Sequence, residues 1–93
     1  YNDFDNKIRV HPNPFINNLD IYYEIATPGN VSISIHNVLG EVVSVITNKY
    51  HEAGTYQLLW GATETGDNLA KGIYFVELNS EPFTKTLKAI KIK

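Results

Sequence analysis

The chain has 93 residues, of which 43% are hydrophobic and 19% charged, no cysteine, and a formal net charge of −2. This length fits one domain, and the hydrophobic content is enough to fill its core. The lack of thiols excludes disulfides and thiolate metal sites, and the slightly acidic balance argues against nucleic acid as a partner.

Along the chain, apolar residues recur with the period of two that is typical of half-buried strands. Residues 1–6 are polar and acidic without a period, which suits a linker. The expected strands are 7–11, 19–25, 31–35, 41–46, 55–60, 72–78 and about 83–92. Short turns separate them and leave no room for a ten-residue helix. The pattern predicts an all-β fold, a seven-stranded antiparallel immunoglobulin-like β-sandwich formed by residues 7–93.

The predicted core consists of apolar side chains on one face of these strands: Ile8, Val10, Leu19, Ile21, Tyr23, Ile25, Val31, Ile33, Ile35, Val43, Val45, Tyr56, Leu58, Trp60, Tyr74, Val76, Leu78, Ile90 and Ile92. In the last strand the apolar residues change parity, so we expect either a bulge near Ala89 or a strand covered on both faces. Gly40 is expected in the left-handed conformation of a hairpin, and Pro28-Gly29 at the centre of a type II turn.

Residues that could carry chemistry are sparse. The three histidines lack metal-ligand spacing and are expected to be ordinary surface residues, and no G-x-S-x-G elbow is present. We therefore predict no enzyme activity and no catalytic, cofactor-binding or metal-binding residues. The loop Glu64–Asn68 offers oxygen ligands for Ca²⁺, although a solvated turn is the favoured interpretation. Three aromatic residues could form a sugar- or protein-binding face or simply pack across strands: Tyr22, Phe75 and Phe83.

The charge distribution is uneven at the end of the sequence. After the last acid, Glu81, come only basic charges, which give the final strand a positive edge: Lys85, Lys88, Lys91 and Lys93. Lysines on an edge strand block aggregation between sheet edges, and they also suit recognition by another protein. The two interpretations are compatible.

Five sequence blocks in a fixed order carry a resemblance to a known family. They are His11-Pro12-Asn13-Pro14-Phe15, the stretch from Val31 to Val43, Ala53-Gly54-Thr55-Tyr56, the stretch from Leu69 to Phe75, and Lys88-Ala89-Ile90-Lys91-Ile92-Lys93. Together they resemble the type A C-terminal sorting domain of the type IX secretion system (Por secretion system), over nearly everything from Lys7 onward. The central blocks also resemble the immunoglobulin-like domain of flagellar hook-capping proteins.

The resemblance implies a C-terminal secretion signal of a larger exported protein. Its implied partners are the type IX outer-membrane translocon, a sortase-like signal peptidase that cuts in or just before residues 1–6, and an N-terminal cargo domain. The cargo would cross the periplasm of a Gram-negative bacterium and then be released or anchored at the cell surface. Carried over by position, the translocon-recognition residues would be Pro12, Asn13, Pro14, Gly40, Gly72, Tyr74, Lys88, Ile90, Ile92 and Lys93.

An alternative stays open at this point. The same sandwich could be a non-catalytic accessory module, structural or carbohydrate-binding, that remains on an extracellular enzyme or adhesin. The sequence also departs from the family where Trp60 is followed by Gly61 instead of the usual Asp, which puts any cation role of that loop in doubt. The absence of a starting Met suggests a segment of a longer chain.

Overall fold

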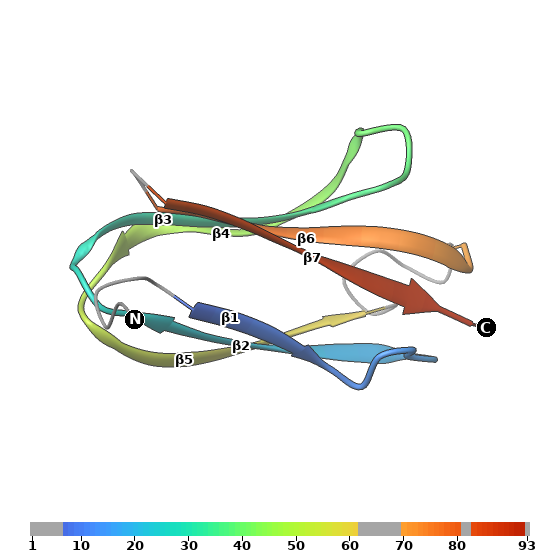
Figure 1. Ribbon diagram of the computed structural model, residues 1–93, viewed down its shortest axis with the longest axis horizontal. Coiled ribbons are helices and arrows are strands. Elements are labelled where there is room, and N and C mark those ends of the chain that lie inside the picture. Colours follow the sequence, from blue (N-terminus) through green and yellow to red (C-terminus); the bar gives the residue numbers. More distant parts are fainter. Residues whose placement is uncertain (1–6, 62–69, 81–82, 93) are drawn as a thin grey trace.

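Seven antiparallel strands form two layers in the computed structural model, which describes residues 7–61, 70–80 and 83–92 (Figure 1). The strands are β1 (Lys7–His11), β2 (Asn18–Ile25), β3 (Gly29–His36), β4 (Val42–His51), β5 (Gly54–Gly61), β6 (Gly72–Ser80) and β7 (Phe83–Lys91). One sheet has the order β1-β2-β5 and the other the order β4-β3-β6-β7. The predicted fold class is confirmed, with β4 extending five residues beyond its predicted end.

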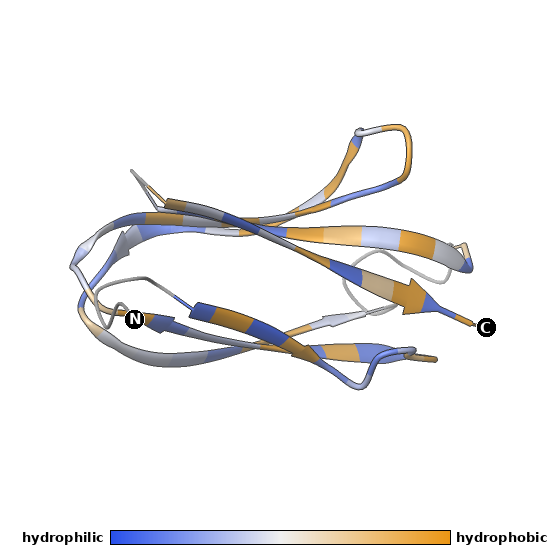
Figure 2. Ribbon diagram, viewed as in Figure 1, coloured by the Kyte–Doolittle hydropathy of each residue, from blue (hydrophilic) through white to orange (hydrophobic). Residues whose placement is uncertain are grey.

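Alternation of side chains along the strands explains the two layers. In β2 and β3 every second residue from Leu19 to Ile25 and from Val31 to Ile35 is buried. Successive side chains of a strand point to opposite faces of its sheet, so each sheet has one apolar inner face. Figure 2 shows this alternation as orange and blue bands along the ribbons.

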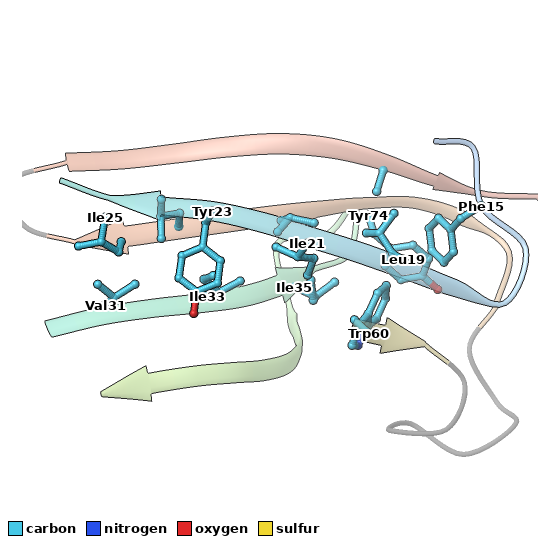
Figure 3. Packing of buried hydrophobic residues seen from close by; sticks show 13 residues of the cluster. Phe15, Leu19, Ile21, Tyr23, Ile25, Val31, Ile33, Ile35, Trp60 and Tyr74 are labelled. Atoms are coloured by element: carbon cyan, nitrogen blue, oxygen red, sulfur yellow. The ribbon is translucent and has the colours of Figure 1, made fainter. Parts of the chain in front are cut away.

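The core lies between the two inner faces and has an aromatic group at one end (Figure 3). There the Trp60 ring lies 5.9 Å from Phe15 and 5.6 Å from Tyr74, measured between centroids. The buried core residues are Phe15, Leu19, Ile21, Tyr23, Ile25, Val31, Ile33, Ile35, Trp60, Tyr74, Val76, Leu78 and Ala89. Most predicted core residues are therefore confirmed, while Phe15 and Ala89 were not predicted.

Val45 was wrongly predicted to be a core residue, and the cause is a pair of irregularities in β4. The β3–β4 register shifts between Ile33 and Ser34 and again between Ile35 and His36. Each shift adds one residue to β4 and interrupts its alternation. Ile46 consequently packs against the core, and Val45 turns outward with 58% of its surface exposed.

The last strand also differs from expectation. Its pairing with β6 runs without interruption from Gly72–Lys91 to Ser80–Phe83, so the bulge expected near Ala89 is absent. Ala89 faces the core, and Ile92, predicted to be buried, is 51% exposed on the other face. Ile90 is half-buried on that outer face, which also differs from its predicted core position.

Two turns test the predicted glycine conformations. Gly40 has a φ of +84°, as predicted for a left-handed position in the hairpin between β3 and β4. Gly29 lacks a positive φ and begins β3, so the predicted type II turn is wrong. The chain enters the strand one residue after Pro28.

Candidate recognition surface

The segment before β2 lies along the outer edge of β7, although the two are about 75 residues apart in the sequence. Asn13 Nδ2 donates a hydrogen bond to the carbonyl oxygen of Lys88 at 2.8 Å. The backbone N–H of Ile90 donates to Asn13 Oδ1 at 3.0 Å. One amide side chain therefore supplies the donor and the acceptor that a neighbouring strand would offer.

Phe15 continues this contact with its own backbone. Its N–H donates to the carbonyl of Ile90 at 2.8 Å, and its carbonyl accepts from the N–H of Ile92 at 3.0 Å. The result is an isolated parallel bridge between Phe15 and Lys91. The edge of β7 is thus paired from the Lys88 carbonyl to the Ile92 amide, and the fully buried Phe15 ring anchors the pairing segment to the core.

Pro12 and Pro14 flank Asn13, and all three residues are exposed. Both proline peptide bonds, His11–Pro12 and Asn13–Pro14, are cis. Prolines lack a backbone donor, so neither residue offers an N–H to a neighbouring strand. The Asn13 side chain, rather than the proline backbone, makes the contacts with β7.

The two faces of the final strand have different roles. Ala89 and Lys91 point inward, whereas Lys88, Ile90 and Ile92 point outward. Lys91 is only 7% exposed; its Nζ donates to the carbonyl of Ile16, and it lies 5.9 Å from the Phe15 ring centroid. The expected run of exposed lysines is therefore wrong at Lys91, whose stem packs inside while its ammonium group reaches a backbone acceptor.

The other expected recognition residues divide between this corner and the rest of the fold. Gly72 pairs with Lys91 and has a φ of +149°, a conformation that L side chains rarely adopt. Tyr74 pairs with Ala89, is buried, and donates a hydrogen bond to the carbonyl of Ala70. Burial raises the pKa of the Tyr74 hydroxyl. Both residues therefore support the corner from within.

Gly40 lies apart from this group. It belongs to the β3–β4 hairpin, and in the sheet order β3 and β6 separate β4 from β7. The Asn37 side chain closes the hairpin, because its Oδ1 accepts from the backbone N–H groups of Leu39 and Glu41. The last expected residue, Lys93, and the possible Ca²⁺ loop Glu64–Asn68 lie outside the described residues.

His51 corrects the expectation that all histidines are ordinary surface residues. It is buried, its Nδ1 donates to the carbonyl of Lys49 at 3.0 Å, and Tyr23 donates its hydroxyl proton to Nε2 at 2.8 Å. Burial, with a smaller contribution from nearby Tyr56, raises the pKa of Tyr23 to about 12. This group closes the end of the core opposite Trp60 (Figure 3). A lone polar residue at the end of a strand gave no periodic signal for this burial.

The remaining polar groups form no reactive cluster among the described residues. His36 accepts or donates at Ser34 Oγ, 2.9 Å from its Nε2, and lies 3.5 Å from Glu77 Oε1. No group of three or more His, Asp or Glu side chains in this part of the chain could hold a metal ion. A cleft of about 790 Å³ opens between β7 and the other sheet, lined chiefly by Ile8, Tyr22, Tyr23, Tyr56, Lys85 and Leu87. Tyr22, Phe75 and Phe83 are half-buried and do not project as a sugar-stacking platform.

Comparison with known proteins gives a family match over most of the chain. The family described as "Secretion system C-terminal sorting domain" matches residues 9–93. No curated protein and no solved structure shows a significant match. The match includes both the Asn13 segment and the strand that it covers. The described residues contain no helix long and apolar enough to cross a bilayer.

Proposed function

The chain belongs to the family of type IX secretion C-terminal sorting domains, and from this premise we propose that the outer-membrane translocon binds it and that a peptidase then removes it. As a C-terminal sorting signal, it labels a cargo that is secreted or displayed at the cell surface. Domains of this kind are typically non-catalytic, so the proposed mechanism is binding followed by cleavage in trans.

The observation that carries the proposal is the matched corner at the end of β7. There the Asn13 segment holds the last strand, and Lys88, Ile90 and Ile92 face outward together. A surface held by backbone pairing loses little conformational entropy on binding, which favours recognition of one shape on many different cargos. We propose that Pro12, Asn13 and Pro14 act by holding this surface. Gly72 and Tyr74 would support it from within.

The proposed domain boundary lies between residues 6 and 7. Residues 1–6 would be the linker in or before which a sortase-like peptidase cuts, and residues 7–93 would be removed as the signal. The cargo would precede the linker on the same chain, fold in the periplasm, and be released or anchored after the cut. Lys93 and Gly40 stay proposed contact residues, the first beside Ile92 in the sequence and the second on the β3–β4 hairpin.

The outward face of β7 gives a sharper test than removal of the strand. Deleting 88–93 would also remove the backbone partners of Asn13 and Phe15, so loss of export could reflect unfolding. We therefore replace only outward side chains, as Lys88→Gln, Ile90→Thr and Ile92→Thr together, in the full chain in its native host. Export should fall strongly while the purified variant melts near the wild-type temperature. Normal export of this variant would contradict the proposal.

Mass spectrometry of the secreted cargo tests the cleavage step. A sorting signal that is removed predicts a mature cargo ending within or before residues 1–6. The accessory-module alternative predicts that residues 7–93 remain on the secreted protein. A cargo that is recovered outside the cell with the whole sandwich attached would therefore favour that alternative.

A further inference from the structure

The outer face of the sheet near Ile92 presents four isoleucines side by side, here called the isoleucine patch: Ile16, Ile73, Ile90 and Ile92. Ile73 and Ile90 are directly paired across β6 and β7. The parallel bridge of Phe15 with Lys91 turns both of those side chains inward and leaves the next residues, Ile16 and Ile92, outward. The end of β7 and the start of β6 appear as adjoining orange bands in Figure 2.

These isoleucines are exposed to an extent that internal packing does not require. Ile16 is 45% exposed and Ile73 is 40% exposed, similar to Ile92, while Ile90 is half-buried. Scattered apolar residues on a surface are ordinary, but a contiguous apolar group with a polar rim is typical of an interaction site. Three neighbouring chain segments contribute to this one.

The charges around the patch are basic. Lys88 precedes Ile90 on the same face, and Lys71 directly precedes Gly72 at the start of β6; both lysines are exposed. The one ion pair among the described residues joins His36 to Glu77, so neither lysine has a carboxylate partner there. A complementary surface would place carboxylates opposite these two lysines.

The backbone edge of β7 is not free to add a strand from a partner. Asn13 and Phe15 already pair with it from Lys88 to Ile92. A partner at this corner must therefore contact the side chains of the outer face. Half-embedded isoleucines on a sheet offer a shallow apolar surface that suits protein packing, since membrane-inserting segments depend on protruding apolar groups.

We propose that the isoleucine patch, including Ile16 and Ile73, is the docking surface for a protein of the export machinery whose apolar face carries carboxylates opposite Lys71 and Lys88. This inference rests on the proposed sorting function and adds to it the contact face and the chemistry of the partner. Ile16 and Ile73 lie outside the residues that the family resemblance singled out. They make the inference separable from the function itself.

The test compares substitutions of opposite charge at Ile16 and Ile73 in the full chain, with export measured in the native host. The pair Ile16→Glu and Ile73→Glu removes apolar contact and adds repulsion, so export should fall at least about tenfold. The pair Ile16→Lys and Ile73→Lys should reduce export less. The milder pair Ile16→Thr and Ile73→Thr keeps β-branched side chains and should give an intermediate loss if folding limits the charged variants.

Leu59→Glu is the matched control, because Leu59 is a similarly exposed apolar residue on the outer face of the other sheet. It should export normally. Wild-type export of the Ile16 and Ile73 variants, with export still lost in the Lys88, Ile90 and Ile92 variant, would overturn this inference and leave the sorting function standing. Equal losses for the Glu and Lys pairs would overturn the acidic partner.

A membrane surface is the other class of partner that this patch could fit. Sedimentation of the purified full chain with vesicles of phosphatidylglycerol and phosphatidylcholine tests it. No binding is expected. Binding that disappears in the Ile73→Glu variant would reassign the patch to a lipid surface and overturn the proposal.

Discussion

Replacing Asn13 by alanine should loosen the edge of β7 at two backbone groups. The change removes the acceptor of the Ile90 amide and the donor to the Lys88 carbonyl. Each hydrogen bond contributes about 0.5 to 1.5 kcal/mol, and both groups lie where water can partly replace the side chain, so we expect a loss of about 1 to 2 kcal/mol in the free energy of unfolding. For a domain of this size, that loss lowers the melting temperature by about 4 to 16 °C.

Two measurements check this expectation. Urea unfolding gives the change in free energy, and amide hydrogen exchange should show faster exchange at Ile90 than in the wild type. The Ile92 amide, which donates to the Phe15 carbonyl, should change less. Asn48→Ala is the control, since it removes a single exposed hydrogen bond from Asn30. Unchanged stability together with a protected Ile90 amide would refute the role given to Asn13.

Three further predictions concern the core, the hairpin and the titration of Tyr23. Phe15→Ala should destabilise the domain by about 3 to 5 kcal/mol in urea unfolding, whereas Ile16→Ala, on the outer face, should have little effect. Gly40→Ala should cost about 1 to 2 kcal/mol because its φ is +84°, while Gly29→Ala, with a φ that is not positive and open space around it, should be neutral; equal effects would argue against backbone strain. The pKa of Tyr23 is raised from 10.0 to about 12, so the folded state holds this proton more tightly, and the unfolding free energy should be at its full value below pH 10 and fall between pH 10 and 12. Tyr23→Phe should flatten that fall, and a slope that persists would point to other groups.

The strands were predictable because alternation is a local signal. Leu19, Ile21 and Tyr23 reveal their shared face within a few residues. Val45 broke the prediction because the extra residues in β4 are visible only in its register with β3. Ile92 broke it because the parity of the last strand was ambiguous, and the regular pairing of Tyr74 with Ala89 decides it.

The recognition corner was predictable in membership but not in mechanism. Family resemblance pointed to Asn13 and Lys88 separately, and the structure brings them into contact. No periodic pattern connects a side-chain amide to a backbone 75 residues away. Phe15 was missed because it lies in a turn; a large aromatic residue directly after Pro14 was the available signal. Lys91 was misassigned because the sequence does not distinguish an exposed lysine from one whose stem is buried.

The bridge from Asn13 and Phe15 to β7 has a consequence for the order of assembly. The two segments that it joins are separated by most of the polypeptide, so the contact has a high sequence separation and its closure entropy is spent late. During translation, residues 88–92 leave the ribosome after the other six strands. A chain interrupted before them has no site on which Asn13 can settle, and the corner that marks a cargo for export exists only on domains that were synthesised to their last strand.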